Sequence, residues 1–179
     1  MADAPVVTIR PATNADTDGI VETVREVFEE YGFAWDEDDY CADLYDVEKH
    51  YVGAGHRFWV AVVDGLVVGT VGLEFFEKVG GDPGGVFIQE GKVRVAGADC
   101  SLERLYVRPT ARGQGLGRAL TELVINEAHD RNREAMEIWS DKKLEDAHRL
   151  YGKFGATVVG ERICDDPDES PEWGMLLLL

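Results

Sequence analysis

Short apolar runs alternate along the chain with stretches in which apolar residues recur every three or four positions, so strands and helices are expected to alternate. Asp64-Gly65, between two β-rich runs, is typical of a two-residue hairpin turn. The predicted strands are residues 6–10, 58–63, 66–76, a short hairpin turning at 90–91, a central strand from about 99 to 108, 135–140, 156–163 and 173–179. The predicted helices run from the capping residues 13–16 to about 32, and over about 36–49, 116–131 and 142–154.

This alternation predicts an α/β fold with a mixed central sheet of about six to seven strands and about four helices. Parallel pairing is needed only where a helix separates two strands, as between the central strand and the strand at 135–140. A length of 179 residues suits one domain, residues 1–179, which can bury a core without disulfides or a metal ion.

The stretch Leu102 to Leu120, LERLYVRPTARGQGLGRAL, joins the central strand to the helix predicted at 116–131 through a turn rich in glycine. Pro109 ends the strand because it has no N–H group for the ladder. Gly113, Gly115 and Gly117 lie where the helix begins, and there the first backbone N–H groups lack partners and the helix dipole favours an anion. The pattern therefore predicts a phosphate-binding turn.

Arg108, Arg112 and Arg118 add positive charge beside this turn. A Walker A loop is excluded because Arg118 and Ala119 follow the last glycine, and the spacing of the glycines also excludes the dinucleotide fingerprint. The pattern that fits is R-x-x-G-x-G. Two alternatives stay open, a glycine turn that only packs a helix on a sheet and a different nucleotide-phosphate site.

The strand, V-R-P and R-G-Q-G-L-G-R-A-L together resemble the acetyl-CoA-binding motif of the GNAT superfamily of N-acetyltransferases. The resemblance implies the acyl-CoA N-acyltransferase (GNAT) fold, in which the two central parallel strands splay apart and admit the pantetheine arm. A main-chain N–H of the central strand would then stabilise the thioester oxygen. The residues that the resemblance assigns to acetyl-CoA are Leu105, Tyr106, Val107, Arg112, Gly113, Gln114, Gly115, Leu116, Gly117 and Arg118.

A second stretch, A-H-R-L-Y-G-K-F-G-A at 147–156, resembles the family's downstream motif, whose helix presents a tyrosine near the thioester sulfur. By this resemblance Tyr151 is the general acid for the leaving thiolate. A thiol pKa near 8.5 and a tyrosine pKa near 10 make that transfer uphill by only about 2 kcal/mol. Glu145 and Ala156 depart from the asparagine and phenylalanine that are usual there, and a core tyrosine is the alternative.

Glu103 is the candidate base that takes a proton from the acceptor amine through water. Many relatives carry this glutamate two positions earlier, where this chain has Ser101. The two-residue period of a strand puts both side chains on the same face, about 7 Å apart. An outward salt bridge is the equal alternative for Glu103.

The acidic and aromatic segment after the first helix lies in the region that commonly lines the acceptor side in the resembled family. A solvated acidic face with inward aromatics is an equally good interpretation. The excursion at about 77–98 could fold over the acceptor site or be a passive insertion. The candidate substrate contacts are Phe33, Trp35, Asp36, Glu37 and Tyr40.

The net charge of −17, from 35 acidic and 18 basic residues, argues against nucleic acid as a partner. The same negative charge repels the polyanionic coenzyme A, so local amides and arginines at the binding turn must overcome this electrostatic repulsion. A salt-loving source and an acidic mesophilic enzyme explain the charge equally well. The charge does not identify the acceptor, and small-molecule and peptide amines both stay open.

Several absences narrow the expectations further. With no apolar run of about 18 residues, and no basic and apolar leader in MADAPVV, we expect a cytoplasmic protein without a membrane span. Cys41, Cys100 and Cys164 show no C-x-x-C spacing and are predicted to be buried thiols. The four histidines show no H-x-x-x-H spacing, so we expect no metal site. A homodimer would follow only by analogy with the family.

These observations predict an enzyme that transfers an acetyl group from acetyl-CoA to a primary amine by direct attack. The alternative is a non-catalytic acyl-CoA sensor or interaction domain. Such a domain would keep the glycine turn but would need neither Tyr151 nor Glu103.

Overall fold

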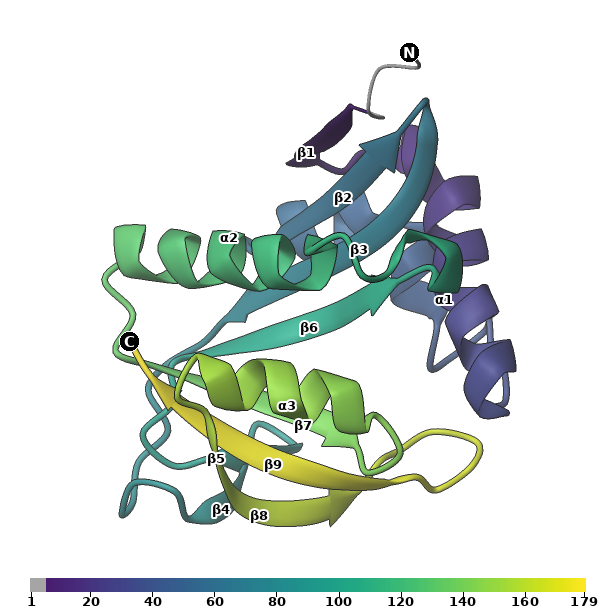
Figure 1. Cartoon of the computed structure of the whole chain (residues 1–179). Coiled ribbons are helices and arrows are strands. Elements are labelled where there is room, and N and C mark those ends of the chain that lie inside the picture. The colour runs from purple at the N-terminus through teal and green to yellow at the C-terminus, as the bar shows by residue number, and fades with distance from the viewer. Residues whose placement is uncertain (1–5) are drawn as a thin grey trace. The chain divides into compact units, whose positions relative to one another are not determined.

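The structure is a computed structural model that describes residues 6–179. Residues 1–5 lie outside the described residues. They are most of the MADAPVV stretch in which we expect no leader. The chain divides into two compact units, which we call the first and the second unit. The first unit holds the N-terminal part up to Gly72 together with Arg104–Glu122, and the second holds Leu73–Glu103 and Leu123–Leu179. Figure 1 labels the helices and strands.

The first unit begins with an antiparallel pair, β1 (Val7–Pro11) and β2 (Arg57–Val63), in register from Val7 opposite Val63 to Pro11 opposite Trp59. Strand β3 (Leu66–Phe75) follows β2 through the predicted hairpin, in which Asp64 and Gly65 both have positive φ, 49° and 82°. This confirms the turn.

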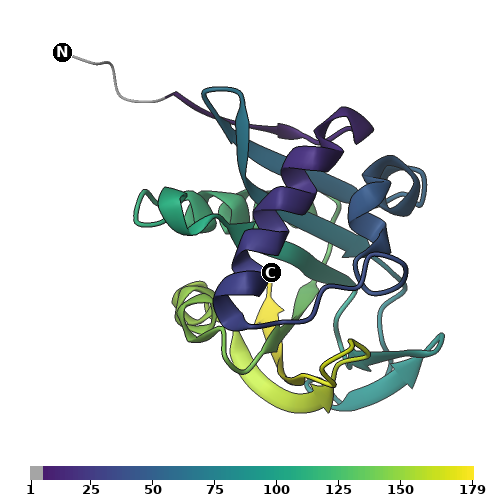
Figure 2. The same cartoon turned by 90° about the vertical axis from the view of Figure 1, so that its right-hand side faces the viewer.

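Helix α1 (Thr17–Tyr31) lies across the strands of this unit (Figure 2). Its residues Ile20, Val24 and Phe28 are buried against a core that includes Phe58 and Val60 of β2. The spacing of three or four residues between them puts them on one face of the helix, as the sequence pattern predicts. The helix is stabilised mainly by the removal of this apolar surface from water.

The predicted helix at 36–49 is wrong. Residues 42–45 form a 3₁₀ turn, Asp46 interrupts it with φ −150° and ψ 70°, and a short π-helical turn follows at Glu48–Val52. Short polar side chains take the backbone donors that a helix would use: Asp36 accepts bonds from the N–H groups of Asp38 and Asp39, and Asp46 accepts one from Lys49. Such local bonds compete with a helix, so the periodic apolar residues were a misleading signal.

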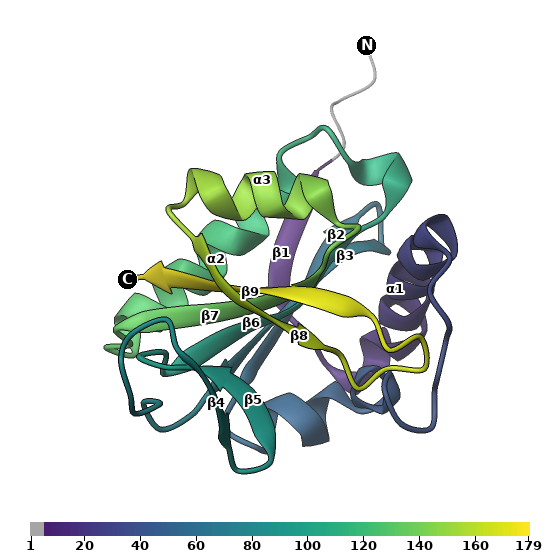
Figure 3. The same cartoon turned by 90° about the horizontal axis from the view of Figure 1, so that it is seen from below.

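The second unit contains a three-stranded antiparallel ladder in the order β7 (Ala135–Asp141), β9 (Pro171–Leu178), β8 (Thr157–Ile163). Helix α3 (Glu145–Lys153) and the hairpin of β4 (Val86–Gln89) and β5 (Lys92–Val95) lie on opposite faces of this ladder (Figure 3). The hairpin turns at Glu90 and Gly91, as predicted, with φ of 51° and 78°.

Strand β6 (Cys100–Val107) and helix α2 (Leu116–Asp130) each have residues in both units. In the second unit β6 pairs with β7 in parallel through Cys100–Met136 and Ser101–Glu137, which confirms the predicted parallel pair. The hydrogen-bonded order β1-β2-β3-β6-β7-β9-β8 makes a seven-stranded mixed sheet. The α/β fold expected from the sequence is therefore confirmed. Among the described residues, no helix combines the length and the apolar character that crossing a bilayer requires.

Candidate functional site

The glycine turn is built as the sequence predicts. A 3₁₀ turn at Pro109–Ala111 ends β6, and α2 begins at Leu116. Gly113 and Gly115 adopt left-handed φ of 77° and 79°, and a Cβ atom at either position would meet no atom within 4 Å. Both glycines are therefore required by backbone conformation, and the space beside them is open.

The main chain gives this turn its capacity for an anion. The first intrahelical bond near the start of α2 runs from Ala119 N to Gly115 O, 2.9 Å, so Leu116, Gly117 and Arg118 occupy the first turn. Amides of a first turn have no partner inside their own helix, and the helix dipole adds partial positive charge. A diphosphate fits these donors.

The arginines beside the turn are committed to carboxylates of the protein, which sequence reasoning did not foresee. Arg112 makes a bidentate pair with Glu30 at 2.8 and 2.6 Å. Arg118 bonds Glu122 at 2.8 Å, four residues along α2. Arg108 bonds Glu22 and Glu26, both at 2.9 Å. An anionic ligand must compete with these carboxylates for the arginines. The backbone amides at the start of α2 are therefore the main groups that attract it.

Arg104 lies within β6 and has a positive φ of 50°. This conformation is unusual for a residue other than glycine, and it is held from both ends. The carbonyl of Arg104 accepts a bond from Thr70 Oγ1, 2.8 Å, and its mostly buried guanidinium donates to Asp43 at 2.8 Å and to the carbonyl of Tyr40. Arg104 thereby fixes the backbone just before Leu105, Tyr106 and Val107, the residues predicted to face acetyl-CoA.

The aromatic members of the predicted substrate set pack inward in the first unit. Phe33 and Trp35 contact Phe28 edge-on with ring centroids 5.5 and 5.4 Å apart, and Tyr40 packs on the same core. Trp35 Nε1 donates to the hydroxyl of Tyr45. These contacts agree with the structural alternative, and the role of these side chains in acceptor binding stays a prediction.

The acidic members of that set have local partners. The Asp36 carboxylate caps the turn that follows it, and Glu37 accepts a bond from the Tyr45 hydroxyl, 3.2 Å. Both carboxylates therefore help to shape the segment in which the sequence pattern predicts a helix.

Tyr151 lies in α3 of the second unit and is buried, with 4% of its surface exposed. Its carbonyl accepts bonds from Phe154 and Ala156, which close the C-terminal end of the helix. On the same helix the imidazole of His148 lies 3.0 Å from Ser140 Oγ, and burial lowers the pKa of His148 below its ordinary value. The helix thus presents the predicted acid on its packed side.

Glu103 lies on β6 in the second unit, on the same face as Ser101. The hydroxyl of Ser101, which is fully buried, donates to Glu103 Oε1 over 2.6 Å. The shared face predicted from the two-residue period is confirmed by this bond.

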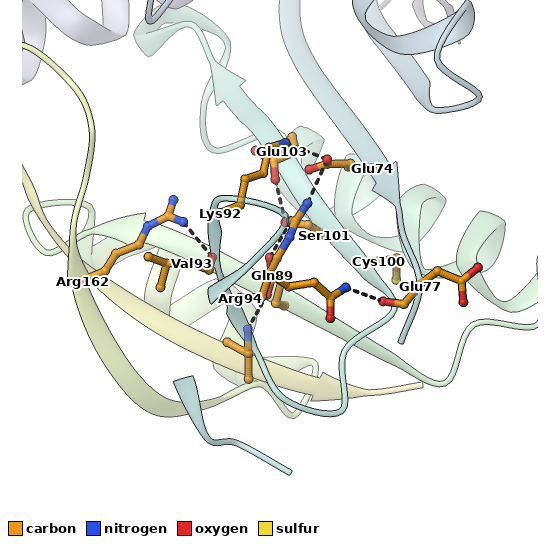
Figure 4. A network of polar contacts seen from close by, with 12 residues as sticks. Glu74, Glu77, Gln89, Lys92, Val93, Arg94, Cys100, Ser101, Glu103 and Arg162 are labelled. Carbon is orange, nitrogen blue, oxygen red and sulfur yellow. Dashed lines mark hydrogen bonds and ion pairs between the residues drawn. The ribbon is translucent and has the colours of Figure 1, made fainter. Parts of the chain in front are cut away.

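An ionic network with a buried centre, Arg94 and Glu137, adjoins this pair (Figure 4). Arg94 of β5 donates to Glu137 of β7 at 2.8 Å and to Glu74 of β3 at 2.9 Å, while Lys92 reaches Glu74 at 2.8 Å. Burial raises the pKa of Glu137, with Arg94 acting in the opposite direction. Burial also opposes ionisation of Glu74, but Arg94 and Lys92 outweigh it and hold its pKa below the ordinary value. No sequence pattern indicates this network, because its members come from separate strands.

The three cysteines are free and buried, as predicted. Burial raises the pKa of Cys41 and of Cys100, so neither thiol is poised as a nucleophile. Within residues 6–179, no three His, Cys, Asp or Glu side chains gather in a way that could hold a metal ion.

Comparison with known proteins places this chain in a family. Residues 21–156 match the acetyltransferase (GNAT) family. The chain is 27% identical over 149 residues to YjgM of Escherichia coli K12, named as an N-acetyltransferase, covering 82% of this chain and 80% of YjgM. It is 28% identical over 152 residues to the aminoalkylphosphonate N-acetyltransferase of Salmonella typhimurium, covering 84% and 85% of the two chains.

A solved structure shows the same fold. yncA from Salmonella typhimurium, determined with its cofactor acetyl-CoA, aligns with a TM-score of 0.68 and 21% identity over 97% of this chain and 94% of that chain. The chain belongs to the acetyltransferase (GNAT) family, and it is an acyltransferase of the acetyl-CoA-dependent N-acetyltransferase class. The resemblance drawn from the two sequence motifs is confirmed.

Proposed function

We propose that this protein transfers the acetyl group of acetyl-CoA to a primary amine by direct attack, with Tyr151 as general acid and Glu103 as the base acting through water. The observation that carries the proposal is the turn at Gly113 and Gly115, open and left-handed at the start of α2, inside the stretch that matches the family. Amides of that turn would hold the diphosphate.

The residues of β6 have a second part in binding. The family resemblance assigns the edge of Leu105, Tyr106 and Val107 to the pantetheine amides, a form of strand addition. The N–H group of Tyr106 or Val107 would donate to the thioester oxygen as it gains negative charge. Arg104, held by Asp43 and Thr70, supports this by fixing the backbone conformation that precedes these groups.

Proton movements are assigned to two side chains of the second unit. Bound acetyl-CoA supplies the thioester carbonyl carbon, at which a C–N bond forms and the C–S bond breaks. Glu103 accepts, through a water molecule, the proton that the amine must lose. Tyr151 gives its hydroxyl proton to the leaving thiolate and recovers one from solvent. No covalent enzyme intermediate is required.

Coenzyme A release, measured as free thiol against a panel of amines, tests this proposal. The panel should include an aminoalkylphosphonate, which the Salmonella relative is named for, together with simple primary amines and short peptides with free N-termini. We expect turnover with at least one of them. We also expect a loss in kcat of about 10²-fold or more in Tyr151→Phe, in line with general acid catalysis.

The matched control is Tyr51→Phe, because Tyr51 is also buried and donates its hydroxyl to Asp43 in the first unit. It should lose some stability, and its kcat should fall far less than that of Tyr151→Phe. Saturable acetyl-CoA binding in calorimetry without turnover on any amine would contradict the enzymatic proposal and favour a sensor. A missing calorimetric signal at saturating acetyl-CoA would contradict the binding assignment as well.

A further inference from the structure

Three polar side chains stand in a row across the strands of the second unit. Ser101 of β6 is in register with Glu137 of β7. Phe76 N donates to Asp99 O over 3.2 Å where β3 ends and β6 begins, so the antiparallel pairing of these neighbours sets Glu74 opposite Ser101. Residues opposite one another on adjacent strands share a face, with Cβ atoms about 5 Å apart. Ser101 is therefore flanked by two carboxylates.

Arg94 spans this row from the β4–β5 hairpin. Its Nη1 and Nη2 atoms donate to Glu137 Oε1 and Glu74 Oε1 respectively, so the guanidinium bridges the residues on either side of Ser101. It also lies 3.8 Å from the ring centroid of Phe76. The other oxygen of Glu137 accepts the N–H of Val95 at 2.6 Å. Both flanking carboxylates are thus committed to the hairpin.

The hydroxyl of Ser101 points along its own strand instead. It donates to Glu103 Oε1, two residues further on, over 2.6 Å (Figure 4). A distance this short is typical of a hydrogen bond from an O–H donor to an ionised carboxylate. Such a bond is about twice as strong as a hydrogen bond between neutral groups. Because Ser101 is fully buried and flanked on both sides, its hydroxyl has little freedom to turn.

We infer that Ser101 is a positioning residue for the base Glu103. Arg94, by bonding Glu137 and Glu74, holds in place the two strands that flank Ser101. The inference rests on the proposed function, because it assigns Glu103 the role of base. The bond fixes the direction of the Glu103 carboxylate and favours its ionised form, which is the form a base needs. The Ser101 hydroxyl thereby connects its own position on β6 to the carboxylate two residues further on.

Steady-state kinetics of Ser101→Ala over a range of pH test this inference. We expect kcat to fall by about 10-fold to 100-fold, because a small misplacement of a catalytic group is that costly. The acidic limb of the kcat/KM profile should move to higher pH, because the carboxylate has lost a donor that favours its charged form. The KM for acetyl-CoA should stay unchanged, and Ser101→Thr, which restores a hydroxyl, should recover most of the lost kcat.

The matched control is Ser140→Ala, which removes another buried serine hydroxyl of the second unit, one bonded to His148. It should leave the acidic limb in place. If Ser101→Ala does not fold, Ser101→Cys keeps the side-chain size with a weak donor and takes its place, with the same shift expected.

Glu103→Gln separates the two claims. If Glu103→Gln loses activity while Ser101→Ala keeps the wild-type kcat and acidic limb, the positioning role is overturned and the proposed function stands. If Glu103→Gln is as active as the wild type, the base assignment fails and the positioning role fails with it. A uniform loss in Ser101→Ala at every pH, without rescue by threonine, would show a merely structural serine.

Discussion

The glycine turn of the first unit works with main-chain groups of consecutive residues at 112–118, whereas the ionic network of the second unit joins side chains from β3, β5 and β7. The turn is open, because a Cβ atom added at Gly113 or Gly115 would meet no atom within 4 Å. The centre of the network is buried, with Glu137 fully enclosed and Arg94 only 6% exposed. Changes in the turn should therefore act on binding, and changes in the network should act on stability first.

The largest effect is expected where the network loses its central cation. In Arg94→Met the buried carboxyl group of Glu137 loses its guanidinium partner, and removing one partner of a buried pair costs about 3–5 kcal/mol. Urea unfolding should show this loss as a lower midpoint with an unchanged slope. The double variant Arg94→Met with Glu137→Leu should recover much of the loss, because no unpaired charge is left buried.

Arg118→Met is the counterpart in the turn. Its pair with Glu122 is exposed on both sides, and such pairs contribute only about 0–1 kcal/mol. The unfolding midpoint should barely move. Equal losses in Arg94→Met and Arg118→Met would contradict the contrast between the two regions.

Gly115→Ala should separate binding from stability. A side chain at φ of 79° is strained by about 1–3 kcal/mol, and a Cβ atom would also stand beside the amides that we assign to the diphosphate. We expect acetyl-CoA binding to weaken about 10-fold, which corresponds to about 1.4 kcal/mol. Calorimetric titration measures this change.

Gly32→Ala is the matched control for that variant. Gly32 ends α1 with φ of 71° and, like Gly115, has room for a Cβ atom, which would meet no other atom within 4 Å. It should lose similar stability and keep the wild-type Kd. A Kd that weakens equally in both variants would mean that strain, rather than the loss of an anion site, explains the result.

The same contrast explains what the sequence could predict. The Asp64-Gly65 hairpin, the turn at Gly113 and Gly115 and the parallel pair of β6 with β7 depend on local backbone chemistry or on a helix between two strands, and the structure confirms all three. Local patterning fails at 36–49, where Asp side chains compete for the backbone donors.

The side-chain partners were beyond local reasoning. Arg112 meets Glu30 across 82 positions of sequence, and Arg94 meets Glu137 across 43. Nothing in the neighbourhood of either arginine specifies a partner so distant, because such pairs depend on how strands and helices pack. Ser101 was visible only as a departure from a family pattern, and its bond to Glu103 required the structure.

Glu30→Gln tests whether the carboxylate beside the glycine turn weakens the binding of an anion there. It leaves Arg112 without its bidentate partner, so the guanidinium becomes available to an anion. We expect acetyl-CoA to bind about 2-fold to 5-fold more tightly at low salt, and the gain should shrink as salt screens the charges. Calorimetry in low and high salt checks this, with Glu29→Gln, the preceding residue on α1, as the control. No change in Kd at low salt would mean that Arg112 takes no part in binding.

The smallest expected effect comes from His148 on α3, the helix that carries Tyr151. Burial is the main cause that lowers the pKa of His148, and Asp141 opposes it. The folded protein therefore binds this proton less readily than the unfolded chain does. His148 favours the folded state above the unfolded pKa of about 6.5, and this contribution is lost as the pH falls through the lower folded value. His148→Gln should thus show a smaller fall in the free energy of unfolding than the wild type between pH 7 and 5. The exposed His129, changed to Gln, should follow the wild type, and a wild-type slope in His148→Gln would contradict a burial effect on this helix.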